Sequence, residues 1–350
     1  RNRGVSAVYQ ELCTHGSGNG LYIVEFPELE GMRFCELFGL FPRAVPLGLL
    51  RTENGTTTSC LNPSGNTVLQ KQDRIAFMAS THDSIKKEEI SEVAVQTGKS
   101  FADRPEQPRV HRRVLCLGWN DRMPLFLREL EFSPRETFEL DILSRLDSSL
   151  RQTRMERYGT PRNGLVRNFR GDYIAHGELA RFNPSTYDSV VVFASDRMAS
   201  REEADARAVL GYHLLHQGPE SSTPGHVLVE ILDPENVALL ERSRCEVITS
   251  PVMLSHMVAH VALRPELNPI FYQLLVSGGV EIAFHSVAEY GLEEGVWDFS
   301  AIQVAAQKRG DIALGVRQGG SERTLLNPDR QKSLNLGTEA KIAVLTSNSD

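Results

Sequence analysis

The sequence has no paired-cysteine motif, no long apolar run and no excess of positive charge, and each absence excludes a class of protein. Its five cysteines are scattered and never stand in C-x-x-C spacing, so they indicate neither a zinc site nor a complete disulfide framework, and a reducing cytoplasm suits them best. No stretch approaches the ~18 apolar residues of a membrane-spanning helix, and the first residues, RNRGVSAVYQEL, lack the apolar core of a signal peptide. We therefore expect no membrane span within this chain.

Nucleic acid binding and catalysis find equally little support. The formal net charge of -7 and the pI of about 5.9 give no general attraction to nucleic acid. No G-x-S-x-G turn, no phosphate-binding loop with its lysine and no cysteine–histidine nucleophile pattern occurs in the sequence. His256 and His260 stand one helical turn apart but lack the glutamate of H-E-x-x-H. These absences predict a protein that is not an enzyme and has no nucleic acid partner.

The sequence does contain a repeat, because its two ends resemble each other. The segment VYQELCTHGSGNGLYIVEFPELEG near the start resembles FYQLLVSGGVEIAFHSVAEYGLEEG near the end, with Tyr9 opposite Tyr272 and Gly31 opposite Gly295. The similarity continues through LGLLR and LGVRQ, CLNP and LLNP, and DRIAFMAS and AKIAVLTS. Each copy is predicted to form a helix, several strands and an Asn-Pro turn before the last strand, so the chain carries a duplicated α+β module.

The middle of the chain has a different pattern. Residues 82–109 are charged and weakly patterned, which indicates a linker, and residues 110–262 alternate apolar runs with helical stretches. This alternation predicts a parallel sheet with helices on both faces. Strands are expected at Val114–Leu117, Phe138–Leu143, Leu165–Phe169, Ser189–Ala194, His226–Ile231 and Cys245–Ile248. Helices are expected at Pro124–Glu131, Ser148–Tyr158, Gly177–Phe182, Arg201–His216, Pro234–Ser243 and Val252–Leu263.

The first of these strands leads into LCLGWNDRMPLF, which keeps one glycine of the dinucleotide-binding fingerprint G-x-G-x-x-G. Gly118 can form the tight turn, but Asn120 stands where a pyrophosphate would approach the backbone, and Met123 stands where helix and strand would pack closely. The second strand ends at Ser144-Arg145 and not at an acid that could bind a ribose. The turn therefore argues against NAD and leaves open a mononucleotide, a phosphate held by Arg145, or no ligand.

Two groups of candidate site residues follow from this sheet. The candidate ligand cleft consists of Gly118, Trp119, Asn120, Ser144 and Arg145. Trp119 could stack on a base or form a wedge between domains. Four carboxylates follow strand ends and are expected at one rim, where they could bind Ca²⁺: Asp121, Asp172, Asp196 and Glu230. Their alternative roles are to cap the following helices or to be neutralised by Arg145, Arg170 and Arg197.

The order of several segments resembles a known group of proteins. The segments VLCLGWNDRMPLFLREL, FRGDY, YDSVVVFASD, EEADARAVL, HVLVEILDPEN and CEVITSPVMLSHMVAH, followed by a smaller α+β lobe, resemble the RCK (regulator of potassium conductance) domains of ligand-gated cation channels. Within that group the chain looks most like the CASTOR/POLLUX family, in which a strand followed by Gly-Trp occurs as at Gly118-Trp119. The same family offers parallels to EEADAR, EILD and SGGVEI.

The resemblance implies a fold and a domain organisation. The fold would be α/β, a Rossmann-like doubly wound parallel sheet flanked by two copies of a small α+β RCK C-lobe. Residues 1–81 would be the C-terminal lobe of a preceding RCK domain and 82–109 a linker; 110–262 would be the Rossmann-like N-lobe and 263–350 the crossover helix and C-lobe. Pore helices would precede Arg1.

The resemblance also implies a function, that of a cytosolic gating ring at the cytoplasmic face of a membrane. In such a homo-oligomeric ring four subunits each contribute two RCK domains, and a regulatory ligand, Ca²⁺ or a nucleotide, biases the equilibrium between two ring shapes and so acts on the pore of the same polypeptide. Two alternatives stay open. A soluble RCK/KTN regulatory subunit of a potassium transporter would have no pore helices, and a nicotinamide-dependent oxidoreductase would need the missing glycines and acid.

The last predicted helix of the sheet domain carries an apolar stripe. Met253, Leu254, Met257, Val258 and Val261 recur at helical spacing. RCK lobes pair through helices of this kind, so the resemblance implies that the protein forms at least a dimer through Val252–Leu263 together with Asn268–Val276. The alternative is that the stripe packs entirely within its own domain.

Overall fold

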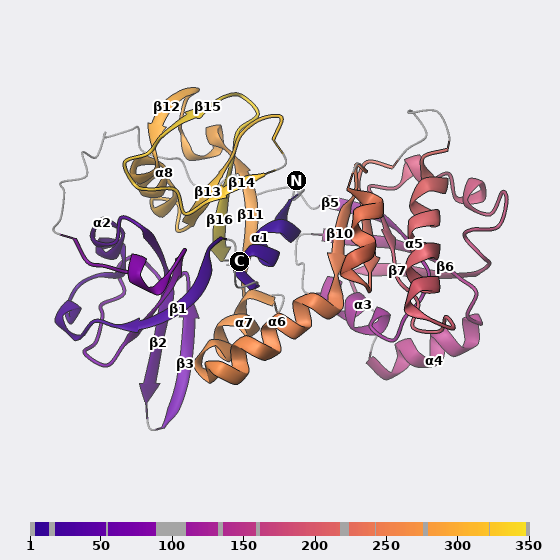
Figure 1. Cartoon of the computed structure of the whole chain (residues 1–350), viewed down its shortest axis with the longest axis horizontal. Coiled ribbons are helices and arrows are strands. Elements are labelled where there is room, and N and C mark those ends of the chain that lie inside the picture. The colour runs from indigo at the N-terminus through magenta and orange to yellow at the C-terminus, as the bar shows by residue number, and fades with distance from the viewer. Residues whose placement is uncertain are drawn as a thin grey trace. The chain divides into compact units, whose positions relative to one another are not determined.

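The computed structural model describes residues 4–13, 18–53, 55–88, 110–131, 136–158, 162–217, 224–241, 243–275, 279–321 and 323–347 of the 350-residue chain. The chain divides into two units, one made of Arg1–Pro105 with Ser255–Asp350 and the other of Glu106–Leu254 (Figure 1). Most of the predicted linker, residues 89–109, lies outside the described residues, as does the start of the SGGVEI segment.

The unit Glu106–Leu254 is built on a six-stranded parallel sheet with the strand order β10-β9-β8-β5-β6-β7. The strands are β5 (Val110–Leu117), β6 (Glu136–Ser144), β7 (Gly164–Arg170), β8 (Ser189–Val192), β9 (Val227–Ile231) and β10 (Glu246–Thr249). The order reverses between β5 and β8, as the doubly wound prediction requires. The carboxyl ends of these two strands therefore form the switch point, where open α/β sheets bind ligands.

Helices cover both faces of this sheet, and the alternation of side chains along β5 shows why. Leu115 lies in one buried cluster with Tyr212, whereas the next residue, Cys116, lies in a second cluster with Leu127 and Met155. Successive side chains of a strand point to opposite faces of the sheet. The helices of this unit are α3 (Met123–Glu131), α4 (Ser148–Tyr158), α5 (Arg201–Leu215) and the beginning of α6 (Ser250–Leu263). Thus α5 packs on one face, and α3 and α4 pack on the other.

Two of the expected helices are shorter than the sequence pattern suggested. The segment expected as a helix at Gly177–Phe182 forms the 3-10 helix η4 (Leu179–Phe182), and that at Pro234–Ser243 forms the 3-10 helix η7 (Pro234–Leu240). Asn183 ends η4 in the left-handed conformation with a φ of 47°, and the 3-10 helix η5 (Pro184–Thr186) follows. Gly177, at the expected start of this helix, is also left-handed, with a φ of 77°, so only a single turn forms between the two residues.

The other unit contains the two copies of the repeated module, and their sheets share one topology. The N-terminal copy has the antiparallel strand order β1-β4-β2-β3 and the C-terminal copy the order β11-β16-β13-β14. The N-terminal copy comprises α1 (Val5–Cys13), β1 (Gly20–Glu25), η1 (Pro27–Leu29), η2 (Phe34–Glu36), α2 (Leu37–Leu40), β2 (Ala44–Glu53), β3 (Thr56–Leu61), β4 (Arg74–Ala79) and η3 (His82–Ser84). The C-terminal copy follows η8 (Pro265–Leu267) and comprises α7 (Asn268–Leu275), β11 (Val280–Ser286), η9 (Val287–Tyr290), β12 (Gly295–Asp298), α8 (Phe299–Gln307), β13 (Ile312–Arg317), β14 (Thr324–Leu326), β15 (Ser333–Leu336) and β16 (Lys341–Ser347).

The copies also share an irregularity in the sheet. The pairing of β2 with β4 shifts register at Gly48, and the pairing of β13 with β16 shifts at Gly315. A Cβ atom at Gly48 would lie 2.3 Å from the carbonyl oxygen of Cys60, and one at Gly315 would lie 2.2 Å from that of Leu325. Both positions thus require glycine because a neighbouring strand passes too close for any side chain.

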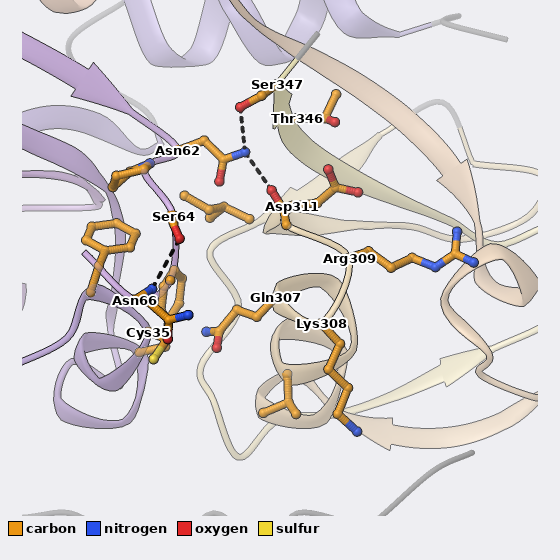
Figure 2. Close-up of a pocket in the computed structure, with 17 residues that line it drawn as sticks. Cys35, Asn62, Ser64, Asn66, Gln307, Lys308, Arg309, Asp311, Thr346 and Ser347 are labelled. Carbon is orange, nitrogen blue, oxygen red and sulfur yellow. Dashed lines mark hydrogen bonds between the residues drawn. The ribbon is translucent and has the colours of Figure 1, made fainter. Parts of the chain in front are cut away.

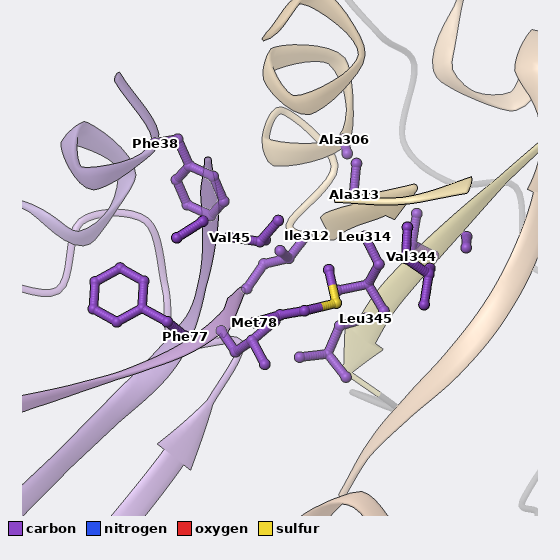
Figure 3. Close-up of a cluster of buried hydrophobic side chains, with 14 of the residues drawn as sticks. Phe38, Val45, Phe77, Met78, Ala306, Ile312, Ala313, Leu314, Val344 and Leu345 are labelled. Carbon is purple, nitrogen blue, oxygen red and sulfur yellow. The ribbon is translucent and has the colours of Figure 1, made fainter. Parts of the chain in front are cut away.

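One hydrophobic cluster unites the two copies. It contains Val45 and Met78 from the N-terminal copy together with Ile312 and Leu345 from the C-terminal copy, all of them buried. Figure 3 shows these side chains of β2 and β4 meeting those of β13 and β16. The burial of each sheet face against the other copy explains why the two modules form a single unit.

The boundary of the sheet domain differs from the prediction. The division between the units falls between Leu254 and Ser255, inside α6, and not after residue 262. Met257 and Val261, farther along this helix, pack against the cluster of the repeated modules. The apolar spacing of the stripe identified the helix correctly but could not show which core each turn would join. Among the described residues, no helix has both the length and the apolar character that crossing a bilayer requires.

Candidate functional site

The turn after β5 needs its glycine for two reasons. Gly118 has a φ of 90°, a backbone conformation that side chains disfavour. A Cβ atom there would also lie 2.7 Å from the carbonyl oxygen of Phe193, which follows β8 across the switch point. The backbone N–H of Gly118 donates to the carbonyl of Leu143 at 2.9 Å. The turn therefore joins three neighbouring strands of the sheet at their carboxyl ends.

Asn120 holds this turn to the strands on the other side of the switch point. Its side chain is buried, and its Nδ2 donates to the carbonyl of Ala194 at 3.1 Å and to Oε2 of Glu230 at 2.9 Å. The N–H of Ala194 donates to the same carboxylate oxygen at 3.2 Å. The place at which a dinucleotide phosphate would approach the backbone thus contains a hydrogen-bond network within the protein.

Glu230 extends this network to α6. Its Oε1 accepts a hydrogen bond from Arg122 at 2.5 Å and another from the hydroxyl of Ser250, the first residue of α6. The side chain of Glu230 is about 10% exposed, so its charge depends on these donors for stabilisation. One carboxylate therefore connects the turn after β5 with the start of a helix.

The other residues of the predicted ligand cleft lie in different surroundings. Trp119 is 1% exposed and belongs to the buried cluster that contains Met123, so its ring has no face available to stack on a base. The hydroxyl of Ser144 accepts a hydrogen bond from the N–H of Leu146 at 3.2 Å. The side chain of Arg145 is 58% exposed. Of the five predicted residues, Gly118 and Asn120 are the two that contact the strands across the switch point.

Arginines pair with three of the predicted rim carboxylates, Asp121, Asp172 and Glu230. Asp121 forms salt bridges with Arg154 and, at 3.6 Å, with Arg197, and its N–H donates to Oδ2 of Asp196 at 2.8 Å. Arg197 thus pairs with a rim carboxylate as the alternative proposed, whereas Arg170 pairs with Asp147 outside the rim.

Asp172 stands in a similar arrangement on its own. It pairs with Arg207 and, at 3.9 Å, with Arg145. The Arg207 guanidinium also lies 5.6 Å from the ring centre of Tyr173, whose pKa is raised to about 12 by burial and only partly lowered again by that charge. Within the described part of the chain, no three histidine, cysteine, aspartate or glutamate side chains are placed to hold a metal ion.

Sequence reasoning missed two buried carboxylates in this unit. Asp205 in α5 is 1% exposed and accepts hydrogen bonds from the N–H groups of Leu232 and Asp233 at 2.8 and 2.9 Å, so it holds the loop after β9. Asp141 in β6 is paired with Arg167. The available signal for Asp205 was its place three residues before the buried Ala208 and seven before the buried Tyr212, a helix face on which a solvated acid is not expected.

A pocket between the two copies of the repeated module is a second candidate site, which the sequence did not indicate. Its volume is about 750 Å³, within the ~300–1,000 Å³ of typical ligand pockets. The N-terminal copy contributes the Asn-Pro turn, residues 62–66, with parts of η2 and α2. The C-terminal copy contributes the end of α8, the turn into β13 and the end of β16. Figure 2 shows polar side chains from both copies around this space.

Polar groups of the pocket fall into two kinds. Asn62 is engaged, because its Nδ2 donates to the carbonyl of Gly310 at 2.7 Å and to the hydroxyl of Ser347 at 3.1 Å (Figure 2). The Nε2 atom of Gln307 and the hydroxyl of Thr346 are buried and have no hydrogen-bond partner among the described residues. Thr346 is only 3% exposed. Buried polar groups of this kind normally have a partner, so these two are candidates for contact with a ligand.

Comparison with known proteins gives consistent results along the chain. Residues 1–96 match the family model described as Castor and Pollux, part of voltage-gated ion channel. The chain is 22% identical over 95% of its length to the Probable ion channel POLLUX of Oryza sativa subsp. japonica, of which it covers 37%. It is 23% identical over 94% of its length to the Ion channel CASTOR of Lotus japonicus, of which it covers 42%. The chain therefore spans less than half the length of these relatives.

The fold has a match among solved structures. The structure of the human SLO3 gating ring superposes with a TM-score of 0.71 at 13% sequence identity, over 98% of this chain and 72% of that chain. At this identity the likeness concerns the fold. The chain is thus similar to the CASTOR and POLLUX ion channels along nearly all of its length, and its fold is similar to that of the human SLO3 gating ring.

Proposed function

We propose that the chain is the cytosolic regulatory region of a ligand-gated cation channel, and that the pore belongs to another part of the same polypeptide. The observation that carries this proposal is the combination of a doubly wound sheet with two copies of one module, which matches a gating ring over 98% of the chain. Kinship with the CASTOR and POLLUX channels supports the same function. In this role the chain changes shape on ligand binding and transmits that change to the pore.

The network at the switch point offers a physical route for such a change. Glu230 binds both the turn after β5, through Asn120 and Arg122, and the first residue of α6, Ser250. A change in the position of the turn would alter the hydrogen bonds that hold the start of α6. In the proposed function, Glu230 thereby links the carboxyl end of the sheet to this helix.

Assembly into a ring would use the exposed part of the α6 stripe. Leu254 and Val258 are 62% and 60% exposed, whereas Met257 and Val261 are partly buried against the cluster of the repeated modules. All four residues lie on one face of the helix, but packing within the chain covers only the edge with Met257 and Val261 and leaves the edge with Leu254 and Val258 exposed. We propose that a second copy of the chain covers Leu254 and Val258, and that four subunits complete the ring.

Light scattering tests the assembly. The wild-type chain is expected to form dimers or larger assemblies at high concentration, and Leu254→Glu with Val258→Glu is expected to give monomers because two charges would be buried at the contact. Leu239→Glu is the matched control, because Leu239 is 59% exposed in η7 and outside the stripe. A monomeric wild type, or an unchanged assembly of the double variant, would contradict the proposed interface.

Current recordings test the channel function. The full-length polypeptide, with the sequence that precedes Arg1, is expected to conduct cations in planar bilayers, and Glu230→Gln is expected to change its open probability. If the upstream sequence encodes no pore helices, the soluble subunit of a potassium transporter becomes the better interpretation. Saturable quenching of protein fluorescence by NADH would instead favour an oxidoreductase.

A further inference from the structure

The contact between the two repeated copies has approximate two-fold symmetry. Asn62 and Asn327 occupy equivalent Asn-Pro turns, and both are left-handed, with φ values of 47° and 45°. Each donates its Nδ2 across to the other copy: Asn62 to the carbonyl of Gly310 at 2.7 Å and Asn327 to that of Arg43 at 2.9 Å. Features on one side of this contact can therefore be compared with their equivalents on the other.

The two turns differ at their fourth residue. Gly65 stands in the N-terminal copy where Arg330 stands in the C-terminal copy. The backbone at these positions is used in the same way, since the carbonyl of Gly65 accepts from the N–H of Cys35 at 3.0 Å and that of Arg330 from the N–H of Ser300 at 3.1 Å. The difference is thus confined to the presence or absence of a side chain.

The side chain of Arg330 fills its side of the contact. The residue is 5% exposed, its Nη2 donates to the carbonyl of Ala44 at 2.6 Å, and its guanidinium carbon lies 5.3 Å from the ring centre of Phe299. Burial lowers the pKa of Arg330 to about 9, so the group stays charged at neutral pH. A guanidinium cation therefore lies against an aromatic ring and a backbone carbonyl.

The pocket presents the equivalent groups with no side chain between them. Phe34 begins η2 as Phe299 begins α8, and Asp311 precedes the bulge glycine of its strand by the same number of residues as Ala44 does. Phe34, Gly65 and Asp311 all line the pocket. The pocket is thus the counterpart of the space that Arg330 occupies in the C-terminal copy.

Other positions around the pocket are more polar than their equivalents. Gln307 is the last residue of α8 and Leu40 the last of α2; Thr346 stands in β16 where Ala79 stands in β4. Leu40 and Ala79 are buried apolar residues of the core, whereas Gln307 and Thr346 place the two unpartnered polar atoms at the pocket. Lys308 adds a positive charge to the lining. A ligand in this pocket would therefore contact hydrogen-bonding groups in addition to the space that corresponds to the guanidinium of Arg330.

We propose that this pocket binds a small molecule with a guanidinium group at one end and a carboxylate at the other, of the size of free arginine. The guanidinium lies against the ring of Phe34 and the carbonyl of Asp311, as Arg330 does against Phe299 and Ala44. The guanidinium also donates to the hydroxyl of Thr346, which lies next to Asp311 on the neighbouring strand, and the carboxylate accepts a hydrogen bond from Nε2 of Gln307. This binding site does not depend on the proposed channel function, because it can be measured on the purified chain.

Calorimetry and thermal unfolding of the purified chain with free arginine test the proposal. We expect a saturable heat of binding and a melting temperature that rises with arginine concentration by mass action. Citrulline has the same shape without the guanidinium charge, and agmatine lacks the carboxylate. Each is expected to bind about tenfold more weakly or worse, because it leaves one end of the pocket without its partner.

Two variants locate the binding. Gly65→Arg introduces the side chain found in the other copy and is expected to abolish the response to arginine; a Cβ atom there lies 3.3 Å from Cβ of Cys35, so a small shift accommodates it. Thr346→Val preserves shape and removes the hydroxyl, and should weaken binding about tenfold. It serves as the second test if the first variant fails to fold. Gly337→Ala, with no atom within 4 Å of the added Cβ, is the control that should bind normally.

Three results would overturn the proposal. The first is no saturable heat with the wild type up to about 10 mM arginine, a concentration that would detect millimolar affinity. The second is an equal rise in melting temperature for wild type and Gly65→Arg, which would show a solvent effect of arginine. The third is equal binding of arginine and citrulline, which would show that no guanidinium is recognised.

Discussion

The two copies of the repeated module agree in what their backbone requires and differ in what they present to each other. Both place glycine at the sheet bulge, at Gly48 and Gly315, because a neighbouring strand leaves no room for a side chain. At the fourth residue of the Asn-Pro turn, in contrast, one copy has Gly65 and the other the buried Arg330. Residues that the module needs in order to fold, such as the bulge glycines, are therefore the same in both copies, whereas some residues at the contact between the copies differ.

The start of the 3-10 helix after the first strand of each sheet gives a second difference of this kind. In the N-terminal copy η1 begins with Pro27, which has no N–H that needs a partner. In the C-terminal copy η9 follows Ser286, which forms a capping box with Glu289. The two copies thus deal with the unpaired backbone N–H groups at the start of this helix in different ways, one with a proline and the other with a side-chain cap.

Substitution of the bulge glycines should have the largest effect and should be equal in both copies. Gly48→Val and Gly315→Val each place a Cβ atom within 2.3 Å of a backbone oxygen, so a strand must move. We expect each to lower the free energy of unfolding by about 3 kcal/mol or more, measured by urea denaturation. Gly39→Ala is the control, because nothing lies within 4 Å of the added Cβ. A large loss for only one of the two would show that the copies do not share the bulge.

Arg330→Gly should have the next largest effect and should make the two copies more alike. The variant opens a cavity, which destabilises the fold, but it also removes a buried charge whose desolvation is unfavourable. We therefore expect the free energy of unfolding, measured by urea denaturation, to fall by about 2 kcal/mol. Arginine in solution is expected to restore part of this loss by occupying the new space. Citrulline should not, and equal rescue by both would indicate that shape alone matters.

The repeated modules and the parallel sheet could be predicted from the sequence because they depend on local patterns. Apolar runs, the Asn-Pro turns and the glycine after β5 each act within a few residues, and they predicted the strands and the parallel sheet. The 3-10 helix η4 was an exception, because the left-handed Gly177 and Asn183 confine it to a single turn that the apolar spacing did not reveal.

The switch-point network and the pocket were harder to predict because the residues that form each of them are far apart in the sequence. Asn120 and Glu230 are 110 residues apart, and nothing in either segment indicates that their side chains meet. The pocket depends on the contact between two copies and on an absent side chain at Gly65. The signal that could have found it is the alignment of the repeat itself, in which a glycine stands opposite Arg330 and a threonine, Thr346, opposite an alanine.

The left-handed asparagines should show an intermediate effect that tests the symmetry of the contact. Asn62→Ala and Asn327→Ala each lose two hydrogen bonds to the other copy and place alanine at a φ near +46°, so we expect each to cost about 1–2 kcal/mol in urea denaturation. Asn62→Gly and Asn327→Gly keep the backbone conformation and lose only the hydrogen bonds, so they should cost less. If alanine and glycine have equal effects, the left-handed conformation contributes nothing.

Glu289 should give the smallest effect and one that depends on pH. The hydrogen bond from His285, at 2.8 Å, together with the N–H of Ser286, lowers the pKa of Glu289 to about 2 in the folded chain. A carboxyl whose pKa is lowered by folding stabilises the protein above its unfolded pKa, and this contribution disappears as the pH falls toward the folded value.

At neutral pH, Glu289→Gln should therefore lower the melting temperature slightly, since a cap is worth about 1 kcal/mol. The difference from wild type should shrink as the pH falls from about 4.5 toward 2. Glu28→Gln in η1, where Pro27 replaces the cap, should show no such pH-dependent difference, and an equal response of the two variants would remove this distinction between the copies.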